Sequence, residues 1–199
     1  MRGAVLAGGK ASRFGGKPKG LERVGDERIL DRVVEAMTTA VGAKPLLVAN
    51  APDAAHWRPD LRVVPDALPD QGSLGGIHTA VTADQGPVLV TGWDMPFLPH
   101  SLLTALIDGA RPYDAFLPES GGRRGVEPLC AVYGPACGPA IQARLAAGDR
   151  RAVGFHDAVR VGILPRDEVA RHGDIDLMFF NVNTAEDLRK AEAWWARRG

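Results

Sequence analysis

The stretch LAGGKASRFGGKPKG, residues 6–20, decides how the rest of the chain is interpreted. It follows a short apolar run and contains two glycine pairs, at positions 8–9 and 15–16. Three cations surround the second pair: Arg13, Lys17 and Lys19. Glycine lets a backbone approach a ligand closely, and clustered cations attract an anion. The stretch therefore predicts a phosphate-binding loop at the end of a strand, with a mobile turn as the alternative.

This loop differs from two common phosphate-binding motifs. A P-loop requires Ser or Thr after its Gly-Lys pair, whereas Pro18 follows Lys17, and Ala11 stands where the first glycine is needed. The dinucleotide fingerprint requires glycines two and then three residues apart, a spacing that the pairs at 8–9 and 15–16 do not provide. The sequence therefore indicates another class of phosphate-binding loop.

The composition is that of a globular protein without net charge. The 199 residues are 45% hydrophobic, and 24 Lys and Arg balance 24 Asp and Glu. These values predict one domain, residues 1–199, with a sizeable core. A nucleic-acid partner is not expected, because proteins that bind duplexes are normally basic.

Location and cysteine chemistry are constrained as well. Cys130 and Cys137 form no CxxC motif, so we expect two reduced thiols rather than a disulfide framework or a zinc site. No apolar run approaches the roughly 20 residues of a membrane span. The run at residues 4–7 is too short for a signal peptide. We therefore expect a cytoplasmic protein without a membrane partner.

Apolar runs alternate with helical patterns along the whole chain. Several runs are apolar throughout, which is typical of strands covered by helices on both faces. The alternation predicts a three-layer α/β/α fold with a mostly parallel, Rossmann-like sheet. The expected strands are 4–7, 46–49, 62–64, 87–91, 114–117, 129–133, 160–164 and 177–183, and the expected helices are 29–41, 75–83, 101–109, 140–147 and 184–198.

The last expected helix has a clear start signal. Thr184 can cap its N-terminus, and Asp187, three residues later, completes a variant of the capping box. We expect Trp194 and Trp195 on this helix to pack in the core or at an interface rather than to bind a ligand.

Polar side chains follow several of the expected strands, where open α/β sheets bind ligands. Asn50 and Asp66 each come after an apolar run, with ordinary turn chemistry as the alternative. Asp94, within TGWDMPFLP, follows the run at 88–90 in a loop that we expect to be exposed. Mg²⁺ prefers one or two carboxylates together with substrate phosphates, so Asp94 is a candidate metal ligand, with a helix cap or turn as the alternative.

Two further segments are candidate binding elements. GSLGG, residues 72–76, is expected to form a second glycine loop ahead of a helix, in which Gly75 and Gly76 allow close approach of a planar or phosphate group. NVNT, residues 181–184, places the amides of Asn181 and Asn183 around the end of the last expected strand.

Taken in order, these segments resemble the molybdenum cofactor guanylyltransferases. The resemblance rests on LAGG-xxx-R-x-GG-xx-KG, strands followed by Asn and Asp, the glycine loop, D-x-P-F-L-P and N-x-N-T-x-E-D-L. It spans nearly the whole chain, and wider Rossmann-like nucleotidyltransferases share the opening loop and D-x-P. It implies the fold of the nucleotide-diphospho-sugar transferases.

The resemblance also implies a role for each matching residue. At the nucleotide these are Leu6, Ala7, Gly8, Gly9, Asn50 and Asp66. At the triphosphate they are the catalytic residues Arg13, Lys19 and Asp94, with Asp94 holding Mg²⁺. Near the pterin they are Asn181 and Asn183.

Two positions depart from the family pattern. Trp93 stands where a cysteine often precedes the aspartate. Glu127 stands before Pro128 where several relatives have histidine, and this leaves the contacts to the pterin open. A carboxylate that faces an anionic pterin phosphate is unfavourable, so we expect Glu127 to pair with Arg123 or Arg124 and to be inessential for the chemistry.

The implied reaction transfers GMP from GTP to the terminal phosphate of molybdopterin carrying molybdenum, and releases pyrophosphate. The implied substrates are GTP and molybdopterin, with molybdoenzymes or their chaperones as recipients. Cytidine-using relatives read LAAG at the first loop, and Gly8 here leaves room for a larger purine. A cytidylyltransferase and a nucleotide-binding adaptor without turnover remain as alternatives.

Overall fold

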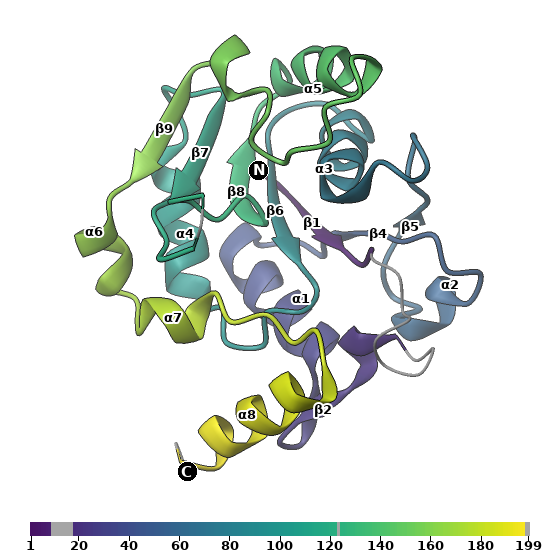
Figure 1. The fold of residues 1–199 in the computed structure, drawn as a ribbon. Helices are drawn as coiled ribbons and strands as arrows, with labels where there is room; N and C mark the ends of the chain where they lie inside the picture. The colour runs from purple at the N-terminus through teal and green to yellow at the C-terminus, as the bar shows by residue number, and fades with distance from the viewer. Residues whose placement is uncertain (9–17, 123, 198–199) are drawn as a thin grey trace.

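The computed structural model describes residues 1–8, 18–122 and 124–197, and every structural statement below refers to these residues. Two predicted site residues, Gly9 and Arg13, lie outside them. The main sheet has seven strands in the order β5-β4-β1-β6-β8-β7-β9, which Figure 1 shows from right to left. The strands are β1 Arg2–Leu6, β4 Leu46–Val48, β5 Val63–Val64, β6 Val88–Gly92, β7 Ala115–Pro118, β8 Cys130–Tyr133 and β9 Val161–Leu164.

The sheet is mostly parallel, as predicted. Strand β1 pairs in parallel with β4 and β6, β4 with β5, and β7 with β9, whereas β8 runs antiparallel to β6 and β7. The four neighbouring strands β5, β4, β1 and β6 therefore point the same way. Their carboxyl ends meet at one edge of the sheet, and residues that follow them gather there.

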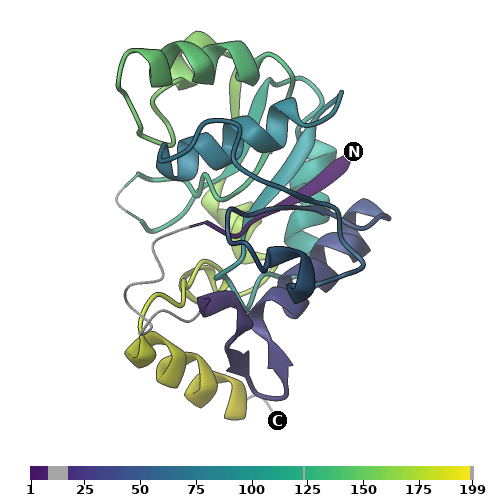
Figure 2. The ribbon, with the colours of Figure 1, turned by 90° about the vertical axis from the view of Figure 1, so that its right-hand side faces the viewer.

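Helices cover both faces of the sheet, which confirms the three-layer prediction (Figure 2). Helices α1, Ile29–Val41, and α4, His100–Gly109, pack against alternate strand residues such as Val5 and Leu89. Helices α3, Gly72–Thr82, and α5, Cys137–Ala146, pack against the intervening residues such as Ala4 and Val90. The apolar runs read as unbroken in the sequence because both strand faces are buried.

Shorter elements surround this core. A small hairpin pairs β2, Arg23–Val24, with β3, Glu27–Arg28, and lies between the opening loop and α1. The remaining elements are the 3₁₀ turns η2 Lys19–Leu21 and η3 His156–Ala158 and the helices α2 Ala54–Trp57, α6 Arg166–Ala170, α7 Ile175–Met178 and α8 Ala185–Ala196. None of the helices in the described residues has the length and apolar character needed to cross a bilayer.

Helix α8 begins as the sequence predicts. The Thr184 hydroxyl accepts the N–H of Asp187, and the Asp187 carboxylate accepts the N–H of Thr184, which completes the capping box. Trp194 packs edge-on against Phe180, with ring centroids 4.7 Å apart. The two tryptophans of α8 therefore pack internally, as expected. Both cysteines are free, as expected, and both are buried.

The strand expected at 177–183 is wrong. The Asp174 side chain accepts the N–H groups of Asp176 and Leu177 and starts the short helix α7, and an irregular segment follows. The apolar residues Phe179 and Phe180 pack against the core from this segment rather than from a strand. The apolar run correctly predicted that this segment packs against the core, but it wrongly predicted that the segment pairs with the sheet.

One histidine is buried and another is half-buried in surroundings that disfavour their charged form. His78, on α3, is 8% exposed, and its Nδ1 has no hydrogen-bond partner among the described residues. Burial lowers the pKa of His78 from its ordinary value, and burial likewise lowers the pKa of His156, partly offset by Asp157. Burial therefore favours the neutral form of both imidazoles in the folded state.

This burial predicts a pH dependence of stability. The pKa of His78 lies lower in the folded than in the unfolded chain, so protonation favours unfolding, and stability is lost as pH falls below about 6.5. Urea unfolding at pH 7, 6 and 5 should show a falling free energy. His78→Gln should reduce this fall, and His156 should contribute to the slope that remains. An unchanged slope in the variant would contradict the assignment.

Candidate active site

The carboxyl edge of the parallel strands gathers most of the predicted site residues. The Ala7 N–H donates to the Val48 carbonyl at 2.8 Å, and the Trp93 N–H donates to the Leu6 carbonyl at 3.2 Å. These bonds extend the pairing of β1 with β4 and β6 beyond the strands. They place Gly8 beside the segments that carry Asn50 on one side and Asp94 on the other.

A cluster of three side chains lies at the end of β6. The Lys19 ammonium donates to Asp94 Oδ2 at 2.5 Å and to Asn183 Oδ1 at 2.7 Å. These three residues come from the opening segment, the centre and the C-terminal segment of the chain. The structure thus brings together three of the predicted site residues.

Asp94 is more enclosed than its loop position predicted. The residue is 8% exposed, whereas an exposed strand-end loop was expected. The cause is the C-terminal segment, which covers the loop: the Val182 N–H donates to the Asp94 carbonyl at 2.9 Å. A buried carboxylate needs a charge partner, and Lys19 supplies it.

Asn50 and Asp66 form a second pair at the same edge. The Asn50 amide donates to Asp66 Oδ2 at 2.7 Å, and the Asp66 N–H donates to Asn50 Oδ1 at 2.7 Å. Asn50 follows β4 and Asp66 follows β5, so the pair joins the ends of two neighbouring strands. Ordinary turn chemistry, the alternative interpretation of these two residues, explains the pair only in part, because Asn50 and Asp66 lie in different loops.

The predicted second glycine loop is helical. Residues 72–76 form the first turns of α3, so the expectation of a loop ahead of the helix is wrong. A methyl group on Gly76 would lie 3.2 Å from Leu6 Cδ1, and one on Gly75 would lie 2.7 Å from the Gln71 Cβ. Gly76 therefore allows α3 to pack tightly against β1, and Gly75 allows it to pack tightly against the loop that precedes α3.

Asn181 lies outside the Lys19 cluster. Its amide donates to the Phe179 carbonyl at 2.9 Å, which stabilises the turn between α7 and α8. The two predicted asparagines thus differ: Asn183 contacts the cluster, and Asn181 shapes the chain that leads to it.

A tryptophan stack supports the cluster, and the sequence did not predict it. The rings of Trp57 and Trp93 stack with centroids 5.1 Å apart, and both residues are 5% exposed. Gly20 lies against the six-membered ring of Trp93, with no room for a side chain. Because Trp93 precedes Asp94 and Gly20 follows Lys19, this contact holds the backbones of the ion pair together. The departure of Trp93 from the family pattern was its only signal.

Glu127 is half-buried near the same edge. Its Oε1 accepts the Leu129 N–H at 3.0 Å, and the Leu129 carbonyl accepts the Gly92 N–H at 2.8 Å. Burial raises the pKa of Glu127; the Leu129 bond and the charge of Arg124 lower it, and the charge of Asp94 raises it further. Its direct partner is therefore a backbone N–H rather than Arg124, and Arg123 lies outside the described residues.

The cluster fits a divalent cation held jointly with a phosphate ligand. No group of three or more His, Cys, Asp or Glu side chains in the described part of the chain could hold a metal alone. Lys19 engages only Oδ2 of Asp94, and no described residue donates a hydrogen bond to Oδ1. A single carboxylate such as that of Asp94 is the protein contribution that Mg²⁺ needs when phosphates supply other ligands.

The fold and this edge place the chain in the class of Rossmann-like nucleotidyltransferases. The model of the MobA-like NTP transferase domain matches residues 3–160. The molybdenum cofactor guanylyltransferase of Desulfosudis oleivorans is 34% identical, covering 97% of this chain and 95% of its own. That of Rhizobium meliloti is 35% identical, covering 96% and 89%.

A solved structure agrees with these matches. The molybdopterin-guanine dinucleotide biosynthesis protein A of Archaeoglobus fulgidus superposes with a TM-score of 0.82 at 25% identity, covering 99% of this chain and 100% of its own. The chain belongs to the MobA-like NTP transferase family and is a nucleotidyltransferase enzyme.

The packing of Gly20 predicts a steric effect on stability. A methyl group in Gly20→Ala would overlap the ring of Trp93, so either the tryptophan or the Lys19 segment must shift. Overpacking of this kind costs about 1–3 kcal/mol of the free energy of unfolding, measurable by urea denaturation.

A double-mutant cycle isolates the cause. In a Trp93→Ala background the ring is gone, and Gly20→Ala should then cost little more. If the two substitutions are instead simply additive, the Gly20–Trp93 contact is not what holds the segments together.

Proposed function

We propose that this chain transfers GMP from GTP to the terminal phosphate of molybdopterin carrying molybdenum, and releases pyrophosphate. The observation that carries the proposal is the contact of Lys19 with both Asp94 and Asn183 at the end of β6. An ammonium group has three donors, so one that contacts a carboxylate and an amide can also donate a hydrogen bond to a phosphate oxygen. The names of the relatives supply the identity of the two substrates. We further propose that residues 1–199 act as a single domain.

The nucleotide would lie across the ends of β1, β4 and β5. The backbone of Leu6, Ala7 and Gly8 would border it there, and the Asn50–Asp66 pair would offer an amide and a carboxylate. Gly8 is exposed, and a methyl group placed on it would meet no atom of the described residues within 4 Å. We therefore place the ligand beside Gly8.

The acceptor would approach from the side of the C-terminal segment. Asn183 faces Lys19 there, and Asn181 shapes the turn before it. Since the pterin phosphate is already ionised, no general base is needed. The described residues accordingly need only to orient the two phosphates and to offset their charge.

Catalysis would then rest on positioning and charge. The attacking phosphate forms a bond to the α-phosphorus of GTP as the bond to pyrophosphate breaks, and no proton need be removed. Lys19 offsets negative charge on the triphosphate, and Arg13 is proposed to do so as well. Mg²⁺, held by Asp94, would supply further neutralisation of the phosphates.

The proposal is tested by product formation. The protein is incubated with GTP, Mg²⁺ and molybdopterin, and the dinucleotide is sought by mass together with released pyrophosphate. A product with GTP supports the proposal. Binding of both substrates without any product would instead indicate the adaptor alternative.

Removal of the Asp94 charge should abolish most turnover. Asp94→Asn keeps the side-chain shape and an oxygen for Lys19 but removes the negative charge, so it disturbs the buried cluster less than alanine would. Initial rates should fall about 10²-fold or more. Asp108→Asn, an exposed change on α4, is the matched control and should retain the parent rate. Equal rates for the two variants would contradict the role of Asp94.

The nucleotide base should be selected at Gly8. Guanine offers donors and acceptors to backbone groups, whereas a wrong base leaves a polar group unpaired at a cost of about 1–3 kcal/mol. Initial rates at equal subsaturating concentration should therefore favour GTP over CTP and ATP by roughly 5- to 150-fold. Because a methyl group at position 8 meets no atom of the described residues within 4 Å, Gly8→Ala should reduce this preference without unfolding the chain. Faster turnover with CTP would favour the cytidylyltransferase alternative.

A further inference from the structure

Asn183 owes its contact with Lys19 to the position of its backbone. It lies in the irregular segment between α7 and α8, where no strand pairing fixes the chain. Its Oδ1 must stay within hydrogen-bond distance of Lys19 Nζ, at 2.7 Å, for the cluster to hold its geometry. A shift of about 1 Å in a group that orients reacting partners can cost 10²-fold in rate.

The carboxylate of Asp187 holds this backbone. Its Oδ2 accepts the Asn183 N–H at 3.0 Å and the Thr184 N–H at 2.9 Å. The second of these bonds belongs to the capping box of α8. The first bond involves Asn183, which precedes the cap residue Thr184 and whose side chain contacts Lys19. A helix cap does not require that additional bond.

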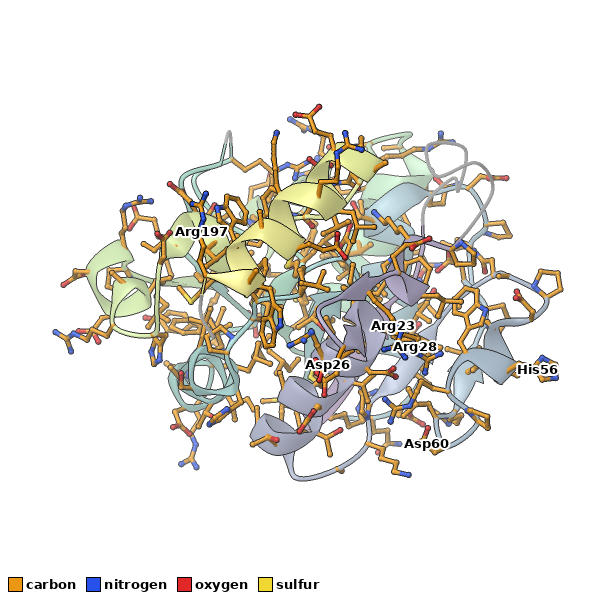
Figure 3. All side chains as sticks on the ribbon, turned by 90° about the horizontal axis from the view of Figure 1, so that it is seen from below. Arg23, Asp26, Arg28, His56, Asp60 and Arg197 are labelled. Atoms are coloured by element: carbon orange, nitrogen blue, oxygen red, sulfur yellow. The ribbon has the colours of Figure 1, made fainter. Side chains whose placement is uncertain are left out.

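Helix α8, which carries Asp187, is itself held in place by contacts with α1 and with the β2–β3 hairpin. The guanidinium of Arg32, on α1, lies 3.7 Å above the ring centroid of Trp195. Gly25, between β2 and β3, leaves the space that the Trp195 ring fills. Figure 3 shows α8 lying beside the segment that carries Asp26, in agreement with the contact of α8 with β2.

We propose that Asp187 is a positioning residue for the reaction: it fixes the Asn183 backbone so that the Asn183 amide holds the Lys19 ammonium at Asp94. The inference rests on the proposed function for its effect on rate. The hydrogen bond by which Asp187 holds the Asn183 backbone does not depend on the identity of the substrate. Asp187 touches neither Lys19 nor Asp94 through any bond recorded in the described residues, so it acts through Asn183.

The capping box supplies a matched control. Thr184 contributes the other half of the box, in which its hydroxyl accepts the Asp187 N–H at 3.1 Å. Thr184→Ala and Asp187→Ala therefore weaken the start of α8 to a comparable degree. Only Asp187→Ala also releases the Asn183 N–H. Asp187→Asn provides the rescue, because one amide oxygen can accept both N–H groups.

The test compares these three variants by turnover and by amide hydrogen exchange. Asp187→Ala should lower kcat about 10-fold or more, with a smaller change in KM for GTP, and should speed exchange at Asn183. Thr184→Ala and Asp187→Asn should keep kcat within about twofold and leave exchange at Asn183 nearly unchanged.

Each outcome decides the inference. Equal losses of kcat in Asp187→Ala and Thr184→Ala would reduce Asp187 to an ordinary cap and overturn the proposal. Slow exchange at Asn183 in Asp187→Ala would also overturn it, whatever the rates. If the parent protein forms no dinucleotide, the proposed function fails, whereas the exchange measurement still decides whether Asp187 holds Asn183.

Discussion

The ion pair between Lys19 and Asp94 is the interaction on which the site depends. It joins the opening segment to the end of the central strand β6, and the amide of Asn183 ties the C-terminal segment to the same ammonium. Both charged side chains are largely enclosed, with 20% of the lysine and 11% of the aspartate side chain exposed. Removal of either partner would leave an uncompensated charge in a poorly solvated place.

The surrounding packing serves this pair. Trp93 and Gly20 bring the two backbones into contact, and Trp57 stacks on Trp93. On the other side, Asp187 and the anchored helix α8 fix the position of Asn183. A lysine held in this way is oriented before a triphosphate arrives, so less conformational freedom is lost when the ligand binds. The ammonium has three donors, of which Asp94 and Asn183 accept two, so the third can donate to a phosphate oxygen.

Much of the fold could be predicted from the sequence, because burial on both faces leaves unbroken apolar runs. Seven of the expected strands were found within one or two residues of their predicted ends, and the capping box of α8 was found as expected. The prediction of a strand at 177–183 was wrong because an irregular segment that packs on Trp194 can have the same apolar sequence as a strand. The helix expected at 75–83 begins three residues earlier, at Gly72, because periodicity cannot separate a glycine-rich first helical turn from a turn before the helix.

The site was predicted as a set of residues but not as an arrangement. The sequence suggested Lys19, Asp94 and Asn183 separately, and only the structure places their side chains together. The enclosure of Asp94 was missed because it depends on the backbone of Val182, which is far away in the chain. The support from Gly20 was missed because a glycine that avoids a distant ring looks like any loop glycine.

A crystal structure with Mg²⁺ and a non-hydrolysable GTP analogue tests the central claim most directly. The account predicts metal on the Asp94 carboxylate, the Lys19 ammonium on a phosphate oxygen, and the base and ribose across Gly8 and the Asn50–Asp66 pair. Asn183 should remain where it is, still held by Asp187. A nucleotide bound at another edge of the sheet, with the Lys19–Asp94 pair undisturbed, would contradict it.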